Sequence, residues 1–313
     1  MGPGASKASN LRPWYFKYDA GNNQSKMPQT FGGDGVPPLI DKPGTPKRRL
    51  GKRMVTRWGA ININGGYSGK KVELTEAATH RRTGRVVGGG QAARGQFKHV
   101  AYVNVEDTTA CGAALLNSKW LLTAGVCLSG YMKWVVYLGI ADLTTSDDYS
   151  LVFQSNTRLE HPGLNTDSKL HNIGLIYVPS KVNYNDYIQP VQLPRYADVD
   201  STFEGVDVMV SGWGAQATGG SGPGVLWYAY FQPVTICSPA WSYCGVGRYN
   251  EAICSGDFGS PMQRAEADGN FTVVGVASFI QGTTTCEGAT SGFAMVAAYL
   301  DWLARHTGLG IRP

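Results

Sequence analysis

A short stretch near the carboxyl end of the chain contains residue types that could do chemistry. Cys254 to Met262, CSGDFGSPM, combines a cysteine, a Gly-Asp pair, a small-residue turn and a proline. A turn of this kind can present a nucleophile, which needs a base within hydrogen-bond reach. The residue at its centre is Phe258, whose phenyl ring cannot attack a carbonyl, and the nearby hydroxyls belong to Ser255 and Ser260. The stretch therefore has residue types that could surround a nucleophile, but its central position holds no nucleophilic side chain.

The elements expected to position this stretch are β-strands. The chain has 313 residues with 41 glycines and 16 prolines, which favours a turn-rich all-β protein over a helical bundle. Short β-branched or aromatic runs such as QFKHVAYVNV, WVVYLGI and FTVVGVASFI are separated by turn residues after residue 85. Helical spacing is clear over Val296, Tyr299, Leu300 and Leu303, with Gly308 as a stop. We expect an antiparallel β domain over 86–313, closed by one helix.

The first 85 residues differ from the rest in composition and charge. They carry 16 Lys and Arg against 5 Asp and Glu, whereas the remainder carries 12 of the 28 basic and 18 of the 23 acidic residues. The balance is therefore +11 in residues 1–85 and −6 in residues 86–313. This Gly/Pro/Asn-rich segment predicts a largely irregular extension, apart from a short hairpin around Asn64. A solvated linker is favoured over a dedicated site for an anionic polymer.

All six cysteines lie in the body of the chain, which favours three disulfides and secretion into an oxidising compartment. Zinc is the alternative, but there is no CxxC pair and no histidine cluster, so no metal or cofactor is expected. The opening MGPGASKASNLRPWYFKY lacks the apolar centre of a signal peptide, and the cysteines are given more weight. No run reaches the ~18 apolar residues of a membrane span. Asn23 and Asn270 begin glycosylation sequons.

Six motifs occur in a characteristic order: RVVGGG from Arg85, CGAALLNSKWLLTAGVC, HNIGLI, VSGWG, CSGDFGSP and YLDWL. Together they closely resemble the chymotrypsin/trypsin-like serine proteases over essentially all of residues 86–313. The resemblance implies an all-β fold of two packed antiparallel six-stranded β-barrels with a carboxy-terminal helix. It also implies three disulfides, of which the second is the least certain because its loop is short: Cys111 with Cys127, Cys237 with Cys244, and Cys254 with Cys286.

The resemblance places the three catalytic positions of the family at Val126, Asn172 and Phe258. The family has histidine in TAAHC, aspartate in DIALI and serine in GDSGGP, where this chain has TAGVC, NIGLI and GDFGSP. Valine accepts no proton, a neutral amide does not stabilise an imidazolium, and a phenyl ring is no nucleophile. The backbone donors of an oxyanion hole, at Gly256 and Phe258, can persist because they do not depend on side chains. We therefore predict a pseudo-enzyme.

The expected specificity pocket is altered as well. Ala252 stands where trypsin-like members have an aspartate that binds Lys or Arg, and Ser278, Phe279 and Ile280 replace the family's SWG. Phe258 and Ile280 are expected to narrow or close the cleft. The remaining hydroxyl and imidazole candidates are interpreted as framework residues: Ser255, Ser260, His80, His99, His161, His171 and His306.

The resemblance also implies an activation site at Arg85-Val86, with Asp257 as the buried carboxylate that the new ammonium group seeks. A buried carboxylate without a partner costs several kcal/mol, so cleavage would favour an ordered arrangement of the loops from Cys254 to Cys286. Either this is a switch that controls binding, or both motifs are inherited relics.

The sequence is thus interpreted as a secreted, non-catalytic serine protease homologue that binds another protein. Family analogy suggests a regulator, adaptor or decoy, for example in an extracellular protease or immune cascade. The alternative is a structural or matrix protein that docks to anionic polymers through residues 1–85. An active serine endopeptidase is a remote third, because it needs chemistry not visible in the sequence.

Overall fold

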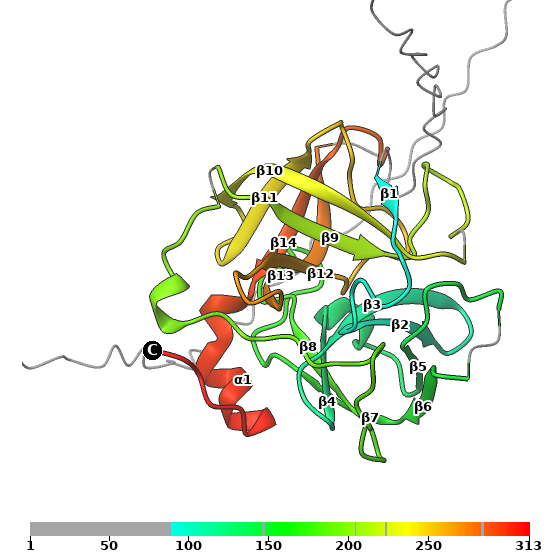
Figure 1. Ribbon diagram of the computed structural model, residues 1–313. Helices are drawn as coiled ribbons and strands as arrows, with labels where there is room; N and C mark the ends of the chain where they lie inside the picture. Colours follow the sequence, from blue (N-terminus) through cyan, green and yellow to red (C-terminus); the bar gives the residue numbers. More distant parts are fainter. Residues whose placement is uncertain (1–88, 146–147, 204, 223, 283–284) are drawn as a thin grey trace, which may run out of the picture. The chain divides into compact units, whose positions relative to one another are not determined.

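The structure is a computed structural model, and it describes residues 89–313 except 146–147, 204, 223 and 283–284 (Figure 1). The predictions made for the extension, the activation site Arg85-Val86, the sequon at Asn23 and His80 lie outside these residues. Within them, no helix is long and apolar enough to cross a membrane.

The first sheet contains seven described antiparallel strands in the order β6-β5-β2-β3-β4-β8-β7. Its edge strands β6 and β7 are separated in the chain only by Asn156, so the chain itself connects the two edges. In β5, Trp134, Val136 and Leu138 are buried because residues two apart share one face of a strand. The strands are β2 (Val100–Val105), β3 (Thr109–Leu115), β4 (Trp120–Thr123), β5 (Trp134–Leu138), β6 (Leu151–Ser155), β7 (Thr157–Glu160) and β8 (Gly174–Tyr177).

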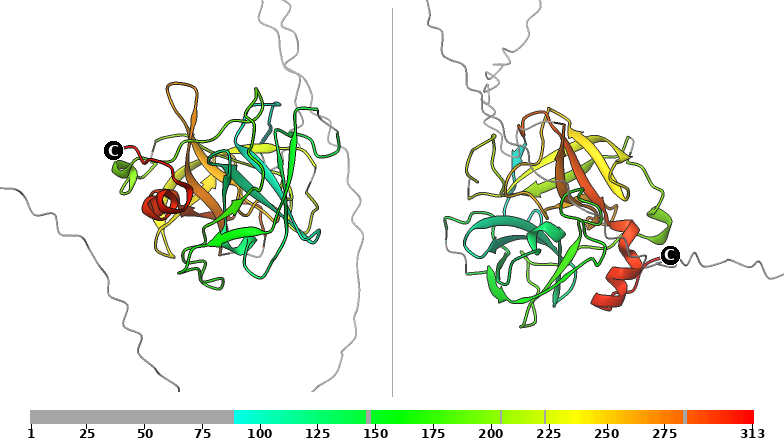
Figure 2. Two further views of the ribbon diagram at one scale, coloured as in Figure 1. Left: turned by 90° about the horizontal axis from the view of Figure 1, so that it is seen from below. Right: turned by 180° about the vertical axis from the view of Figure 1, so that it is seen from behind.

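The second sheet closes on itself. Strand β10 pairs with both β9 and β11, so six strands form a barrel, and the short β1 is added along β10. The two sheets pack against each other (Figures 1 and 2). The predicted all-β fold class is confirmed, with the first barrel present as an open seven-stranded sheet. The strands are β1 (Gly90–Gln91), β9 (Val208–Gly212), β10 (Trp227–Cys237), β11 (Ser242–Gly247), β12 (Pro261–Ala265), β13 (Phe271–Gln281) and β14 (Thr290–Met295).

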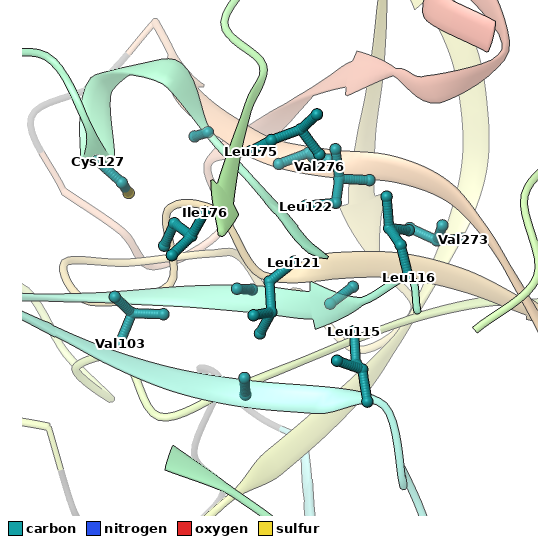
Figure 3. Packing of buried hydrophobic residues seen from close by; sticks show 14 of the residues in the cluster. Val103, Leu115, Leu116, Leu121, Leu122, Cys127, Leu175, Ile176, Val273 and Val276 are labelled. Atoms are coloured by element: carbon teal, nitrogen blue, oxygen red, sulfur yellow. The ribbon is translucent and has the colours of Figure 1, made fainter. Parts of the chain in front are cut away.

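The largest core cluster joins the first sheet to strands of the second sheet and to the segment that follows them. Leu121 and Leu175 of the first sheet belong to the same buried cluster as Val276 of β13 (Figure 3). The predicted closing helix begins as a 3-10 turn, η3 (Val296–Tyr299), and continues as α1 (Leu300–Thr307). Its Leu300 and Leu303 enter this cluster too. Burying each such side chain stabilises the fold by roughly 1.5–3 kcal/mol, so α1 stabilises the packing of the two sheets.

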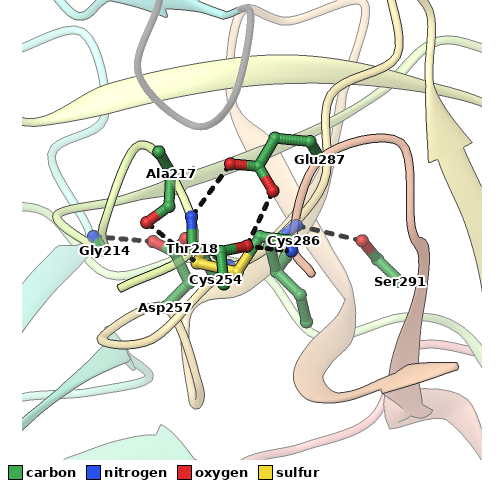
Figure 4. Close-up of a disulfide and its surroundings, with 9 residues drawn as sticks. Gly214, Ala217, Thr218, Cys254, Asp257, Cys286, Glu287 and Ser291 are labelled. Carbon is green, nitrogen blue, oxygen red and sulfur yellow. Dashed lines mark hydrogen bonds between the residues drawn. A yellow bond between two sulfur atoms is a disulfide. The ribbon is translucent and has the colours of Figure 1, made fainter. Parts of the chain in front are cut away.

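All three predicted disulfides are present, including the one considered least certain. Cys111–Cys127 links β3 to the 3-10 turn η1 (Gly125–Cys127), and Cys237–Cys244 closes the β10–β11 hairpin. Cys254–Cys286 connects the CSGDFGSP loop to the segment before β14 (Figure 4). The zinc alternative for these cysteines is thereby excluded.

Candidate functional site

Asn172, at the predicted aspartate position, is fully buried and makes three hydrogen bonds. Its Oδ1 accepts a bond from the backbone N–H of Val126 over 2.8 Å. Its Nδ2 donates to Ser278 Oγ over 2.8 Å and to the Ser278 carbonyl over 3.3 Å. Both ends of the amide are therefore satisfied by neutral partners, and two of the three predicted catalytic positions are in direct contact.

The loop that carries Phe258 is fixed to the same frame. The Phe258 carbonyl accepts a bond from Gly112 N–H, and Gly259 N–H donates to the Ala277 carbonyl, each over 2.8 Å. A Cβ on Gly259 would lie 2.2 Å from Thr123 Oγ1, so the loop presses against the end of the strand that leads into η1. The half-buried Phe258 ring packs against the buried clusters of both sheets. The structure thus gathers the three predicted positions at the junction of the sheets.

The predicted oxyanion donors are present as backbone groups. Gly256 has φ +93°, a conformation that favours glycine, and a Cβ there would lie 3.1 Å from Gly214 Cα. Neither the N–H of Gly256 nor that of Phe258 donates a hydrogen bond to any residue that the structure describes. Neither donor is therefore used within the described part of the chain.

Asp257 belongs to the same loop and has a fully buried side chain (Figure 4). Its Oδ1 accepts a bond from Gly214 N–H over 2.8 Å, and its Oδ2 accepts one from Cys254 N–H over 3.0 Å. It has no ion pair among the described residues. Burial raises the pKa of Asp257 to about 6, although the two backbone bonds oppose that shift. The carboxyl group therefore has two hydrogen-bond donors but no positively charged partner among the described residues.

The two neighbouring serines lie in opposite environments. Ser260 is fully buried, and its hydroxyl has no hydrogen-bond partner among the described residues. It lies between Gly112 and Gly212, whose Cβ atoms would come within 2.1 and 2.8 Å of the Ser260 oxygen. Ser255 is exposed at the loop surface.

The histidines are engaged elsewhere. The rings of His161 and His171 lie 4.8 Å apart, and His171 Nδ1 is 3.2 Å from Tyr299 Oη. Burial lowers the pKa of His161 to about 4, assisted by the nearby His171, whose own pKa is lowered by burial. These side chains face α1, where His306 packs edge-on against Trp302.

His99 lies in a buried polar network that sequence reasoning missed. Its Nε2 is 2.8 Å from Gln263 Oε1, and Gln263 Nε2 donates to Ser211 Oγ over 3.1 Å. Burial lowers the pKa of His99 to about 4, partly offset by the bond to Gln263. The partners are 164 and 52 residues apart in sequence, and no local motif connects them.

The predicted specificity-pocket positions are buried or partly buried. Ala252 is fully buried, and Phe279 is paired across β13 and β14 with Gly292. A Cβ on Gly292 would lie only 2.2–2.4 Å from the tip of the Phe279 ring. Ile280 packs against the Cys254–Cys286 disulfide and the second core. The sequence analysis missed the contact between Phe279 and Gly292, although Gly292 in TSGF was a visible signal.

A cleft of about 360 Å³ lies beside the predicted oxyanion donors. Tyr102 and Trp213 form an aromatic wall with ring centroids 5.8 Å apart, and Ser255 and Gly256 form part of the opposite lining. Sequence reasoning noted Trp213 only as part of VSGWG and missed Tyr102. Among the described residues, no group of three or more His, Cys, Asp or Glu side chains is arranged to hold a metal ion.

The fold and motifs agree with comparisons to known proteins. The family model described as Trypsin matches residues 86–303, and the chain belongs to this family. The chain is 31% identical over 242 residues to Collagenase from Hypoderma lineatum, covering 73% of this chain and 89% of that protein. Serine protease 1 of Drosophila melanogaster is 28% identical over 246 residues, with 76% and 91% covered. The solved structure of HL collagenase has 31% identity and TM-score 0.62, covering 72% of this chain and 100% of that one.

Proposed function

We propose that this chain is a non-catalytic member of the trypsin family that acts by binding another protein, as an extracellular regulator, adaptor or decoy. The observation that carries the proposal is that the hydrogen-bond partners of the buried Asn172 side chain are all uncharged. Its amide is satisfied by Val126 N–H and Ser278, so this buried site neither holds a charge nor lacks a partner. The three disulfides and the extracellular type of the relatives suggest secretion.

The size of the expected catalytic loss supports this proposal. Removing the nucleophile or the base of a catalytic triad lowers turnover by on the order of a million-fold. Here phenylalanine and valine stand at those two positions, and Ser260 is too enclosed to act instead. Backbone donors at Gly256 and Phe258 bind a carbonyl oxygen but break no bond without a nucleophile.

The shape of the site favours a partner that enters from one side. The packing of Phe279 on Gly292 supports a narrowed specificity pocket, so substrate-like peptides should bind weakly. The 360 Å³ cleft beside Gly256 leaves room for a loop of a partner, and its Tyr102–Trp213 wall supplies apolar contact area.

A fluorophosphonate labelling experiment tests the absence of catalysis without requiring a peptide substrate that fits the altered pocket. The purified protein should not be labelled, and Phe258→Ser alone should not be labelled because Val126 supplies no base. The triple variant Val126→His, Asn172→Asp, Phe258→Ser should be labelled at residue 258. Peptide and casein hydrolysis should be absent from the first two proteins.

The matched controls are Ser255→Ala and Ser260→Ala in the unmodified background. Stoichiometric labelling of the starting protein that either control abolishes would reveal an alternative nucleophile and contradict the proposal. Affinity purification from the native source, followed by identification of the co-eluting protein, would identify the partner.

The charge asymmetry favours a second candidate function, docking to an anionic polymer. Residues 1–85 carry a balance of +11, and the remaining body carries −6. Deleting residues 1–85 should abolish heparin retention near physiological salt, where attraction between surface charges is screened but not absent. Equal retention of the truncated protein would exclude this function.

A further inference from the structure

The sequon at Asn270 lies at an exposed position of the fold. Asn270 ends the turn between β12 and β13, and its side chain is exposed. The turn is held by Glu266 N–H donating to the Asn270 carbonyl over 2.8 Å and by Gly269 N–H donating to the Glu266 carbonyl over 3.0 Å. An asparagine followed by Phe271 and Thr272 in this setting meets both requirements of an N-glycosylation site, the triplet and surface access.

The acceptor amide has a defined orientation. Asn270 Nδ2 donates to Asp268 Oδ2 over 2.9 Å, and Asn270 N–H donates to Asp268 Oδ1 over 3.0 Å. An amide nitrogen carries two hydrogens, so a sugar that replaces one leaves the other for Asp268. The folded hairpin can therefore keep the same turn with a glycan attached.

The third sequon residue is buried in the finished fold. Thr272 is fully buried, and its Oγ1 accepts a bond from Arg312 Nη2 over 3.3 Å. Its hydroxyl also bonds to Glu266, which lowers the pKa of that acid. A transferase that must contact both Asn270 and Thr272 can reach the pair only before β12, β13 and the end of the chain have assembled. The modification therefore belongs to the time of synthesis, before folding.

We infer that Asn270 carries an N-linked oligosaccharide that covers the neighbouring cavity. The donor is a polyprenyl-diphosphate-linked oligosaccharide of the secretory pathway. The Asn270 amide nitrogen forms the new bond to the anomeric carbon, and the bond from that carbon to the diphosphate oxygen breaks. The polyprenyl diphosphate leaves with the electron pair, and the amide proton passes to a base of the transferase.

The cavity beside Asn270 has a volume of about 650 Å³. Gly269, Asn270 and Phe271 line one side, and Lys98 and Leu309 contribute to the rest. Because Asn270 is itself a lining residue, the first sugars extend over the mouth of this cavity. No residue that lines this cavity also lines the 360 Å³ cleft, so a glycan at Asn270 begins away from that cleft.

The test uses the full chain secreted from insect cells. Amidase release in heavy-oxygen water should convert residue 270 to labelled aspartate, and Asn270→Gln should remove one glycan from the intact mass. Thr272→Ser, which preserves the sequon, should keep the glycan. Unmodified residue 270 in the secreted protein would overturn the site.

Amine acylation tests whether the glycan covers the cavity. Lys98 should react several-fold more slowly in the glycosylated protein than after glycan release, while the exposed Lys181, which does not line the cavity, should react equally in both. Equal acylation rates at Lys98 before and after glycan release would show that the glycan does not cover the cavity. Neither result depends on the proposed non-catalytic function, because no measurement concerns catalysis or partner binding.

Discussion

Asn172 and Asp257 stand at two buried positions where the family has aspartate, and this chain treats them differently. Asn172 is an uncharged amide with three hydrogen bonds. Asp257 has kept its carboxyl group, which accepts two backbone bonds and has a pKa raised to about 6 by burial. A buried charge needs a partner of opposite sign, and the valine at position 126 provides none for position 172.

The difference concerns the source of the missing cation. At position 172 the family's partner is a histidine side chain, and this chain lacks it, so an amide is the stable choice. At position 257 the family's partner is a new chain terminus created by cleavage, and the Arg85-Val86 bond that would supply it is present in the sequence. The comparison supports the hypothesis that cleavage at Arg85-Val86 still controls Asp257, although the catalytic side chains have been replaced.

Restoring the acid at position 172 should have the largest effect. Asn172→Asp places a carboxylate in a fully buried site with two donors at most, and should lower the free energy of unfolding at pH 7.5 by about 3–5 kcal/mol. The loss should shrink at pH 4.5, where the acid is protonated in the fold. Urea unfolding at both pH values measures this, with exposed Asn156→Asp as the control. An unchanged unfolding midpoint at pH 7.5 would contradict the claim that position 172 cannot hold an unpaired carboxylate.

Asp257 should make the intact protein less stable as the pH rises. Its pKa is about 6 in the fold and 3.8 in the unfolded chain, so between these values only the fold holds the proton. The contribution is fully present below pH 3.8 and is lost as the pH rises through 6, by on the order of 3 kcal/mol. The difference in unfolding free energy between the protein and Asp257→Asn should show this slope. Parallel pH profiles would contradict it.

Cleavage after Arg85 should change the behaviour of this carboxyl group. A new ammonium group beside Asp257 would stabilise the charged form and remove most of the slope described above. Hydrogen exchange should slow in the loops around Cys254 and Cys286, and partner affinity should change. Asp257→Asn should erase both effects. If nicked and intact proteins have the same exchange pattern and affinity, the site is a relic.

The smallest effect, with the opposite sign, is expected at the histidine pair, because the His161 ring is only partly buried and solvent screens its interactions. Because burial and His171 lower the pKa of His161 to about 4, the unfolded chain binds the proton first. The stability from the neutral ring is present above pH 6.5 and is lost as the pH falls toward 4. His161→Gln should flatten the acid side of the stability profile. Ring titration by NMR checks the cause, and a His161 midpoint near 6.5 would rule it out.

The sequence predicted those parts of the fold that depend on local pattern. Alternating burial in β5, the apolar face of the closing helix and the Gly308 stop follow from spacing within one segment. The disulfide pairs were available from the family resemblance, and the structure confirms them. The open seven-stranded first sheet was not predicted, because a division between β6 and β7 at Asn156 has no signal in composition.

The site was predicted where a motif gave the position and missed where strand register decided the contact. Val126, Asn172 and Phe258 were located from their motifs, and the structure gathers them. The Phe279–Gly292 contact was missed because it requires knowing which residues of β13 and β14 face each other. Tyr102 was missed for a similar reason, since its neighbour Trp213 comes from the other sheet.

The ring of Phe279 on Gly292 also makes the protein open to chemical control. An aromatic side chain that lies on a glycine can be exchanged for a diffusible one. Phe279→Ala would leave a space above Gly292 that a small aromatic molecule could occupy. Because Phe279 is only partly buried, the variant should lose less than the about 3–5 kcal/mol typical of a fully buried Phe→Ala change, and should regain part of the loss when benzene or indole is added. Any binding or activity that depends on the neighbouring loops could then be turned on and off by adding or removing a small solute.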